Sequence, residues 1–366
     1  MRKIEQAYKQ AREHERALFV LTENIAATLE KPALERNQRQ LEDTWREINR
    51  FRPQMHALAK VFKDIETPVR TQMSRKDYLF LRKIKTWSSG FAKRLSKWEE
   101  MARCVQRHRK PVRQPLFPEL ALTRQAELLS RIYTAFHRLA NPNNQDIDAK
   151  GHGCFADIEF PIQPFDDFMS AAYRISLALN PRRKLRFLDV GSGGGTKVFA
   201  AKHYFQQADG LEYDQGYATA AQRMLTTIGI SSSTVFHTDA LTFEAYSDYD
   251  VIYFYRPMQD DPLMRKLEQR IITKARPGTI LIAPYETPMA RQKGGICSHI
   301  EGPVFVTGVA KKEIGRLRIN AEMTGFDIVT RSAQWPFDAG YWAPILDTAS
   351  FTGKKNSKRT YRAENA

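Results

Sequence analysis

Residues 188–195 have the sequence LDVGSGGG, which places an acid and closely spaced glycines at the end of an apolar run. Glycine permits a tight turn and lets the backbone approach a ligand closely. Counted from Gly191, the dinucleotide motif GxGxxG fails at Thr196, and the phosphate loop GxxxxGK[ST] fails at Thr196 and Val198. The run therefore indicates a ligand that needs a close backbone wall but no phosphate cradle.

Two further acids follow in the next parts of the chain. Glu212 lies in GLEYD, twenty-one residues after Gly191, and Asp239 lies in FHTDA, directly before Ala240. In parallel sheets, an acid about 20 residues after the glycines can bind ribose hydroxyls. We expect Asp189, Glu212 and Asp239 at the ends of three successive strands, along one edge of a sheet.

The apolar run, Asp189 and the spaced glycines together resemble motif I of the class I (Rossmann-like, seven-strand) S-adenosylmethionine-dependent methyltransferases, and the similarity extends over residues 184–285. The resemblance implies S-adenosyl-L-methionine as the cofactor and methyl transfer as the activity. Asp189 would lie near the positive charges of the cofactor, Glu212 would bind the ribose and Asp239 the adenine. The full set of implied cofactor contacts is Asp189, Gly191, Gly193, Gly195, Glu212, Asp239, Ala240 and Phe165.

The fourth expected strand ends in IYFYRPM at residues 252–258, which by the same resemblance faces the acceptor. Enzymes that methylate the amino groups of adenine or glutamine often carry [DN]PP[YF] there, so YRPM disfavours that subclass. The chain has three cysteines, none of them in a motif typical of cytosine-5 or uracil-5 methylation. Arg256 either clamps a phosphate or carboxylate of the acceptor or forms a structural salt bridge to a facing helix.

A looser resemblance, over residues 155–285, is to the small protein-lysine methyltransferases, in which a stretch containing proline and aromatic residues precedes motif I. Here that stretch is FPIQPFDDF. The resemblance implies a protein amine as the acceptor, Tyr255, Phe165 and Asp166 around it, and Tyr255, Arg256 and Asp166 as catalytic candidates. In the competing interpretation, Phe165 and Tyr255 are core aromatics and Asp166 caps a helix. RNA or another phosphate-bearing acceptor, and a catalytically idle scaffold, are the competing functions.

The elements that must position these residues follow from the spacing of apolar side chains. From residue 184 onward, short apolar runs alternate with helical patterns, which predicts an α/β, doubly wound Rossmann-like sheet with its ligand crevice at the carboxyl ends of the strands. GGICSH, at 294–299, is expected to be a loop after the fifth strand, and FDIVTRSAQ a late strand. Apolar residues at three- and four-residue spacing predict an all-α region with helices over 3–30, 34–65, 74–109 (interrupted near Ser88) and 119–140.

The prolines of PVRQPLFPEL indicate a linker between these parts. We therefore expect a basic helical N-terminal region at 1–118 and a methyltransferase domain at 119–350, whose Rossmann core is 184–335. A basic tail at 351–366 completes the chain.

The net charge of +16 is concentrated in the flanks. Residues 1–113 hold 27 basic and 14 acidic side chains, and residues 103–113 hold five of the basic ones. Such asymmetry predicts contact with a polyanion through 103–113, or else a solvated helical face. Trp87, Phe91 and Trp98 either stack on single-stranded nucleic acid or, as we favour, form the core stripe of a helix. The long helices also predict a homodimer as one arrangement.

Cysteine content and hydropathy are the features that indicate a cellular compartment. Three widely spaced cysteines make no disulfide framework and fit a reducing cytoplasm. The N-terminal residues are not typical of a signal peptide, and no apolar run approaches the roughly 20 residues needed to span a bilayer. The sequence predicts a cytoplasmic enzyme with a macromolecular acceptor, no transmembrane segment and no metal site.

Overall fold

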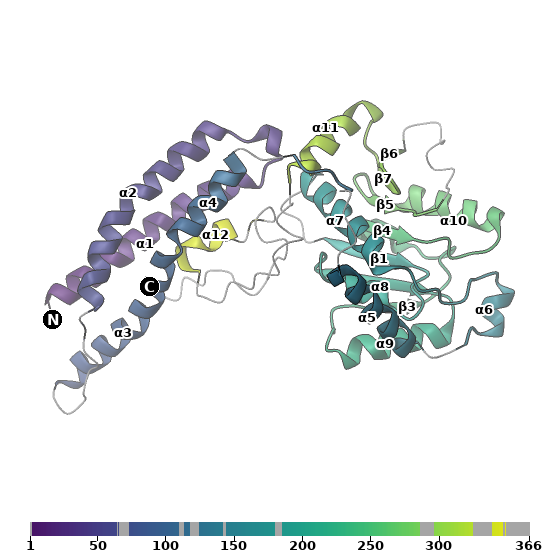
Figure 1. The fold of residues 1–366 in the computed structure, drawn as a ribbon, viewed down its shortest axis with the longest axis horizontal. Coiled ribbons are helices and arrows are strands. Elements are labelled where there is room, and N and C mark those ends of the chain that lie inside the picture. The colour runs from purple at the N-terminus through teal and green to yellow at the C-terminus, as the bar shows by residue number, and fades with distance from the viewer. Residues whose placement is uncertain are drawn as a thin grey trace. The chain divides into compact units, whose positions relative to one another are not determined.

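The computed structural model of the chain describes residues 2–63, 65, 73–109, 113–117, 124–141, 144–179, 185–285, 296–324, 339–346 and 348. The chain forms two compact units (Figure 1). The helical unit comprises Met1–Val112 and Thr330–Ala366, and the sheet unit comprises Arg113–Val329.

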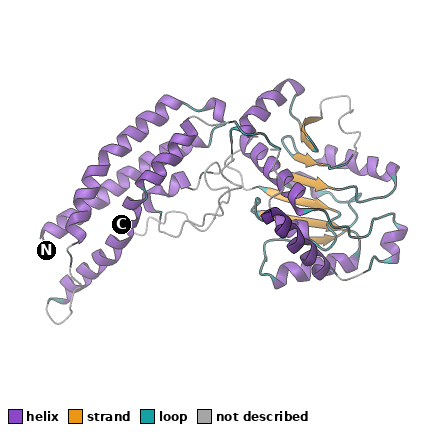
Figure 2. Ribbon diagram, in the orientation of Figure 1, coloured by secondary structure: helices purple, strands orange, loops and turns teal. Residues whose placement is uncertain are grey.

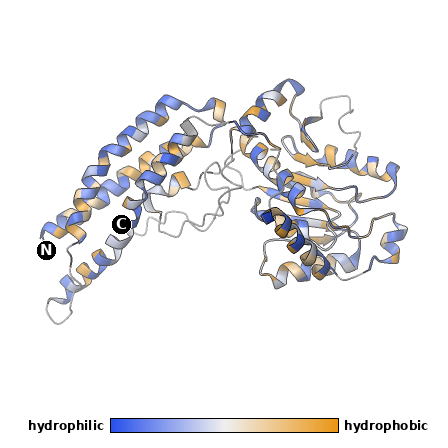
Figure 3. Cartoon of the chain, viewed as in Figure 1, coloured by the Kyte–Doolittle hydropathy of each residue, from blue (hydrophilic) through white to orange (hydrophobic). Residues whose placement is uncertain are grey.

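Long amphipathic helices build the helical unit. They are α1 (Arg2–Leu29), α2 (Gln38–Lys63), α3 (Arg75–Ser96) and α4 (Trp98–Arg109), with a short 3-10 turn, η1 (Ala33–Glu35), after α1. Hydrophilic and hydrophobic residues alternate along them, as the blue and orange bands of Figure 3 show, so each helix has one face to bury. Ser74 begins α3 because its hydroxyl accepts a hydrogen bond from the Asp77 amide. The predicted third helix is divided at Lys97 and not near Ser88.

The core of the helical unit contains the aromatic residues that sequence reasoning assigned to a helical stripe. Phe91 and Trp98 are each only 1% exposed, and Trp87 packs against the same cluster. The indole of Trp98 donates to Asn49 at 2.9 Å. Residues buried in this way cannot stack on nucleic acid, so the core interpretation is confirmed.

A buried ion pair crosses this core. Glu15 and Arg94 side chains are both 4% exposed, and the Arg94 Nη2 atom donates to Glu15 Oε1 at 2.6 Å. Arg94 Nε donates to the same oxygen at 3.0 Å, and the Trp87 indole donates to Oε2 at 3.3 Å. The charges are therefore matched inside the helical unit itself.

Residues near the C-terminus also belong to the helical unit. The 3-10 turn η5 (Gly340–Trp342) leads into α12 (Ala343–Leu346), and Trp342 and Ile345 are fully buried in the same core. The Thr22 hydroxyl donates to the Tyr341 carbonyl at 2.6 Å. This division differs from the expected boundaries, which assigned 330–350 to the methyltransferase domain, because aromatic residues near 340 complete the helical core. The FDIVTRSAQ strand and the 351–366 tail lie outside the described residues.

Among the described residues, a seven-stranded sheet forms the centre of the sheet unit, with the order β3-β2-β1-β4-β5-β7-β6. Neighbours from β3 to β5 are parallel, and β7 is antiparallel to both β5 and β6. This is the expected doubly wound α/β sheet, which follows an all-α region. The strands are β1 (Arg186–Val190), β2 (Gln207–Glu212), β3 (Val235–His237), β4 (Val251–Phe254), β5 (Ile280–Ile282), β6 (Cys297–Glu301) and β7 (Val304–Thr307).

Helices cover both faces of the sheet (Figure 2). Phe165 of α7 packs on Phe187 and Tyr253, while Leu267 and Ile271 of α10 join the cluster on the opposite face. The helices of this unit are α5 (Arg124–Ala140), α6 (Ile147–Gly151), α7 (Ile162–Leu179), α8 (Thr196–Ala201), α9 (Gln215–Thr227), α10 (Asp261–Lys274) and α11 (Lys311–Glu322), with the 3-10 turn η3 (Ala245–Asp248).

One expected loop is partly a strand. Cys297–His299, predicted as loop, form part of β6, which pairs with β7 across the turn at Gly302. The remainder of the segment GGICSH at 294–295 lies outside the described residues. No helix within the described ranges is long and apolar enough to cross a membrane.

Candidate cofactor pocket

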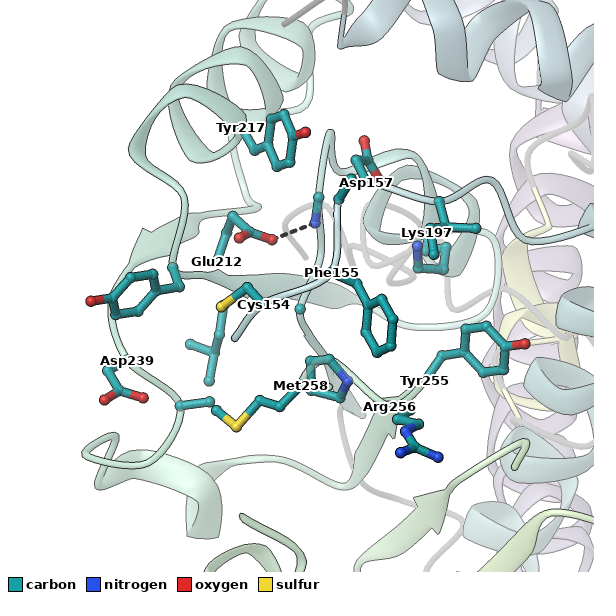
Figure 4. A pocket seen from close by; sticks show the side chains of 18 of the residues that line it. Cys154, Phe155, Asp157, Lys197, Glu212, Tyr217, Asp239, Tyr255, Arg256 and Met258 are labelled. Carbon is teal, nitrogen blue, oxygen red and sulfur yellow. Dashed lines mark hydrogen bonds between the residues drawn. The ribbon is translucent and has the colours of Figure 1, made fainter. Parts of the chain in front are cut away.

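A pocket of about 320 Å³ opens at the carboxyl ends of β1, β2 and β4, where doubly wound sheets bind ligands. Its lining combines the glycine run, the acids after β2 and β3, the residues after β4, and a segment from 154 to 158 that we call the strap (Figure 4). The lining residues are Cys154, Phe155, Ala156, Asp157, Ile158, Gly191, Gly193, Lys197, Leu211, Glu212, Tyr213, Tyr217, Thr238, Asp239, Ala240, Tyr255, Arg256, Pro257, Met258 and Tyr285.

The glycines adopt backbone conformations that other residues rarely reach. Gly191, Gly193 and Gly195 have φ of 78°, 51° and 77°. A Cβ on Gly193 would lie 2.0 Å from Asp157 Oδ1, and one on Gly191 would lie 2.6 Å from Pro257 Cβ. Gly191 and Gly193 thus form a bare backbone wall at the pocket, while Gly195 lies against Ala221 and shapes the turn from outside the lining.

Asp189 lies beneath this wall and not on the pocket surface. It is fully buried on β1, between Gly210 of β2 and Tyr253 of β4, and among the described residues neither carboxylate oxygen has a hydrogen-bond partner. Burial raises the pKa of Asp189 to about 7, and the nearby Lys197 charge opposes that rise. A buried acid without a partner is costly for the fold and is more typical of a functional site than of a core.

Glu212 joins the end of β2 to the glycine run. Its Oε2 accepts from the Gly193 amide at 2.7 Å, and its Oε1 accepts from the Asp214 amide at 2.9 Å. Burial raises the pKa of Glu212 to about 7, although these two amides favour the ionised form. The carboxylate is therefore fixed at the pocket wall, and its contact with a ribose stays a prediction.

The predicted adenine contacts lie at one end of the pocket. Asp239 and Ala240 both line it, and Asp239 Oδ1 accepts from the Leu241 amide at 2.8 Å. The sequence had not indicated the neighbouring aromatic pair, in which the His152 ring stacks on Tyr213 at 4.1 Å with 5° between the planes. With Met258, these flat and apolar surfaces suit a planar base.

Asp157, on the strap, is a site residue that sequence reasoning missed. Its Oδ2 accepts from the Gly194 amide at 2.8 Å and from Asn141 Nδ2 at 2.9 Å, and the side chain is only 7% exposed. The strap is held by the residues after β4, because Cys154 forms a bridge with Met258. No spacing rule connects residue 157 to the glycines, so only the fold reveals the contact.

Tyr255 and Arg256 line the other end of the pocket, where the acceptor was expected. Tyr255 is 42% exposed, and its ring lies edge-on to Phe160 at 5.1 Å. Arg256 has φ of 42°, the sole positive value among the described residues other than glycine. Such a backbone typically costs about 1–3 kcal/mol and is most often found at functional sites. The Arg256 guanidinium pairs with Asp261 at 2.5 Å, as the predicted salt bridge to a facing helix requires.

Two predicted site residues lie away from the pocket lining. Phe165 is 1% exposed and packs between Phe187 and Tyr253, as in the core interpretation. Asp166 accepts a hydrogen bond from the Tyr204 hydroxyl at 2.7 Å, and burial raises its pKa. The structure does not bring either residue together with Tyr255 and Arg256 in the pocket. The reason is that α7 packs Phe165 against the sheet and Asp166 against Tyr204, which follows α8.

No protein-family model and no curated protein sequence matches this chain. Several solved structures overlap part of it. An RNA methyltransferase from Salinibacter ruber in complex with S-adenosyl-L-homocysteine is 18% identical, with a TM-score of 0.32 over 41% of this chain and 91% of that one. A sugar N-methyltransferase from Streptoalloteichus is 17% identical, with a TM-score of 0.30 over 42% and 58% of the two chains.

A third overlapping structure is an S-adenosylmethionine-dependent methyltransferase from Thiobacillus denitrificans, in complex with S-adenosyl-L-homocysteine. It is 18% identical, with a TM-score of 0.27 over 45% of this chain and 56% of that one. The chain therefore spans little more than half the length of the second and third structures. Because the similarity is only partial, the function has to be inferred from the pocket residues.

Proposed function

We propose that this chain is an S-adenosylmethionine-dependent methyltransferase. The observation that supports the proposal is the hydrogen bond between Gly193 and Glu212. The Gly193 amide, on the glycine wall of the pocket, donates to the buried Glu212 carboxylate at 2.7 Å. When bound, the cofactor supplies a methyl group already activated by its sulfonium.

The charge and shape of the pocket fit this cofactor. Its ribose would meet Glu212, and its base would lie by Asp239, Ala240 and Tyr213. The cofactor carries an ammonium and a sulfonium, and the buried carboxylates of Asp157 and Asp189 favour such cations. The volume of about 320 Å³ is of the size typical for small-molecule sites.

The same geometry disfavours a dinucleotide. A pyrophosphate would need free amides on the glycine run, but the Gly194 amide already donates to Asp157 and the Gly193 amide to Glu212. Two carboxylates at that position would repel a diphosphate. Binding of NAD is therefore not expected.

The residues at the end of β4 supply the acceptor side. Methyl transfer depends mainly on positioning and on excluding water, and Tyr255 and Phe155 provide aromatic surface for both. These rings would receive the methylene chain of a protein amine, the acceptor that the sequence favoured. The second candidate is a phosphate-bearing acceptor, because Arg256 also lines this end.

Methylation of cell fractions with labelled cofactor tests the proposal. Radiolabelled S-adenosylmethionine is incubated with the full chain and with separated protein, RNA, lipid and small-molecule fractions. Label transferred to one fraction, and absent with a Gly193→Val variant, is the expected result. If S-adenosylhomocysteine binds but no fraction gains label, the idle-scaffold hypothesis replaces the enzyme.

We also propose that residues 103–113 contact a polyanion, on the strength of the positive charge of 1–113. The side chains of 107–112 lie outside the described residues. Affinity for heparin should fall steeply with salt and should fall further when Arg107, Arg109 and Lys110 become Ala. Indifference to salt would favour the solvated helical face.

A homodimer through the long helices stays a prediction, which sedimentation would test.

A further inference from the structure

Charged residues of both signs line the pocket. In the view of Figure 4, Glu212 and Asp239 lie with Cys154 and Met258 toward one end, and Lys197 and Arg256 lie with Phe155 and Tyr255 toward the other, with Asp157 between Glu212 and Lys197. An amine acceptor carries a positive charge before it loses its proton, so two cations beside the acceptor would repel it. Among the described residues, the acid that pairs with Arg256 is Asp261.

We propose, on the basis of the methyltransferase function above, that the acceptor is a phosphate-bearing molecule whose phosphate binds Arg256 and Lys197. Phe155 and Tyr255 would contact the part of the acceptor that carries the reacting atom. Of the two acceptors named above, the proposal selects the phosphate-bearing one, and it gives a role to Lys197, which sequence reasoning did not single out.

The backbone of Arg256 is held in place, whereas its side chain can leave its ion pair at little cost in free energy. Its positive φ is fixed by neighbours, because the Phe155 amide donates to the Pro257 carbonyl at 3.4 Å and the Gln259 amide to the Gly153 carbonyl at 2.8 Å. The side chains of Arg256 and Asp261 are 43% and 65% exposed, and an ion pair this exposed contributes little to stability. An incoming phosphate can therefore displace Asp261 from the planar guanidinium, which matches phosphate geometry.

Lys197 has no evident structural reason for its position. It lies in the first turn of α8, where a positive charge opposes the helix dipole. Its side chain is half-buried and lines the pocket, and it is in none of the hydrogen bonds or ion pairs found among the described residues. Its charge acts on the buried Asp189 beneath the glycine wall, and in Figure 4 its side chain lies on the side of Phe155 and Tyr255.

Phosphate binding to the cofactor complex tests this assignment. The full chain, saturated with S-adenosylhomocysteine, is titrated with inorganic phosphate at constant ionic strength and followed by calorimetry. We expect measurable binding that Arg256→Gln and Lys197→Met each weaken at least tenfold. The matched controls are Arg265→Gln on α10 and Lys312→Met on α11, both exposed, which should leave phosphate affinity unchanged.

Four results would overturn the proposal. Phosphate affinity could survive both substitutions, or it could fall equally in the two controls, which would mean diffuse attraction. Acetate could bind as tightly as phosphate in the same titration, which would make the anion a carboxylate. Lys197→Met could weaken S-adenosylhomocysteine and leave phosphate binding intact, which would assign Lys197 to the carboxylate of the cofactor. If S-adenosylhomocysteine itself does not bind, the proposed function fails, and that failure is seen before any phosphate is added.

Discussion

One buried carboxylate in the helical unit and one in the sheet unit differ in how their charge is satisfied. In the helical unit, the buried Glu15 carboxylate accepts from both Arg94 and the Trp87 indole. In the sheet unit, the equally buried Asp189 has no hydrogen-bond partner among the described residues. The first arrangement satisfies its own carboxylate, while the second leaves a buried acid without a partner beneath the glycine wall of the pocket. The comparison indicates which unit is built to bind.

Glu15→Ala breaks the matched pair and should have the largest effect. Arg94 would then be a buried charge without its carboxylate, a change that typically costs about 3–5 kcal/mol. We expect the free energy of unfolding to fall by that amount in urea denaturation, while any chain that stays folded binds S-adenosylhomocysteine normally. A loss below about 1 kcal/mol would show that the pair is not needed by the helical unit.

Gly193→Val should remove cofactor binding with little effect on the helical unit. A side chain there would collide with Asp157 and would also strain a φ of 51°. We expect affinity for S-adenosylhomocysteine to fall at least about a hundredfold, or about 3 kcal/mol.

Gly229→Ala is the matched control for that variant. Gly229 has a φ of 77°, but an added Cβ there meets nothing within 4 Å. The Gly229→Ala variant therefore introduces backbone strain without a steric collision. If Gly229→Ala weakens the ligand as much as Gly193→Val does, the glycine wall is not the contact surface.

Tyr255→Ala should separate turnover from cofactor affinity. Its ring lies after β4, edge-on to Phe160 and 42% exposed, so its loss removes acceptor contact without emptying the core. We expect methylation to fall about tenfold, or about 1.4 kcal/mol in transition-state stabilisation, with unchanged S-adenosylhomocysteine binding. Tyr255→Phe should retain most activity. Full activity in a folded Tyr255→Ala chain would mean that the acceptor binds elsewhere.

The smallest expected effect is the pH dependence of cofactor binding. The folded-state pKa of Glu212 is raised to about 7, so its neutral form favours the fold: that contribution is complete below about pH 4.5 and is lost as pH rises through 7. Ribose hydroxyls prefer the ionised acceptor, so S-adenosylhomocysteine affinity should rise severalfold from pH 6 to pH 8. Glu212→Gln should flatten this rise, and an unchanged slope would assign it to another group, such as Asp189.

Local patterns allowed much of the pocket to be predicted. The glycines, Glu212 and Asp239 each follow a short apolar strand, and the carboxyl ends of parallel strands must meet at one edge. For the same reason Tyr255 and Arg256 were expected after β4, where both line the pocket, and their roles toward an acceptor stay a prediction.

Contacts set by the packing of distant segments could not be predicted in this way. Asp157 reaches the glycine run because the strap pairs with residues after β4, about a hundred positions later in the chain. Phe165 and Asp166 carried a plausible aromatic and acidic pattern, but the rotation of α7 buries them against Tyr253 and Tyr204. Likewise, the place of Trp342 in the helical core could not be predicted from the sequence, because its partners lie some 250 to 300 residues earlier. β6 was the exception with a usable clue, the Gly302-Pro303 turn directly before the apolar run of β7.

Calorimetric titration of the full chain with S-adenosylhomocysteine and, separately, with NAD tests the central claim most directly. The unsatisfied acid, the bare glycine wall and the carboxylates at the pocket together predict one S-adenosylhomocysteine site per chain, with affinity in the micromolar range, and no heat from NAD. Binding of NAD, or no binding of S-adenosylhomocysteine to the folded chain, would contradict the account.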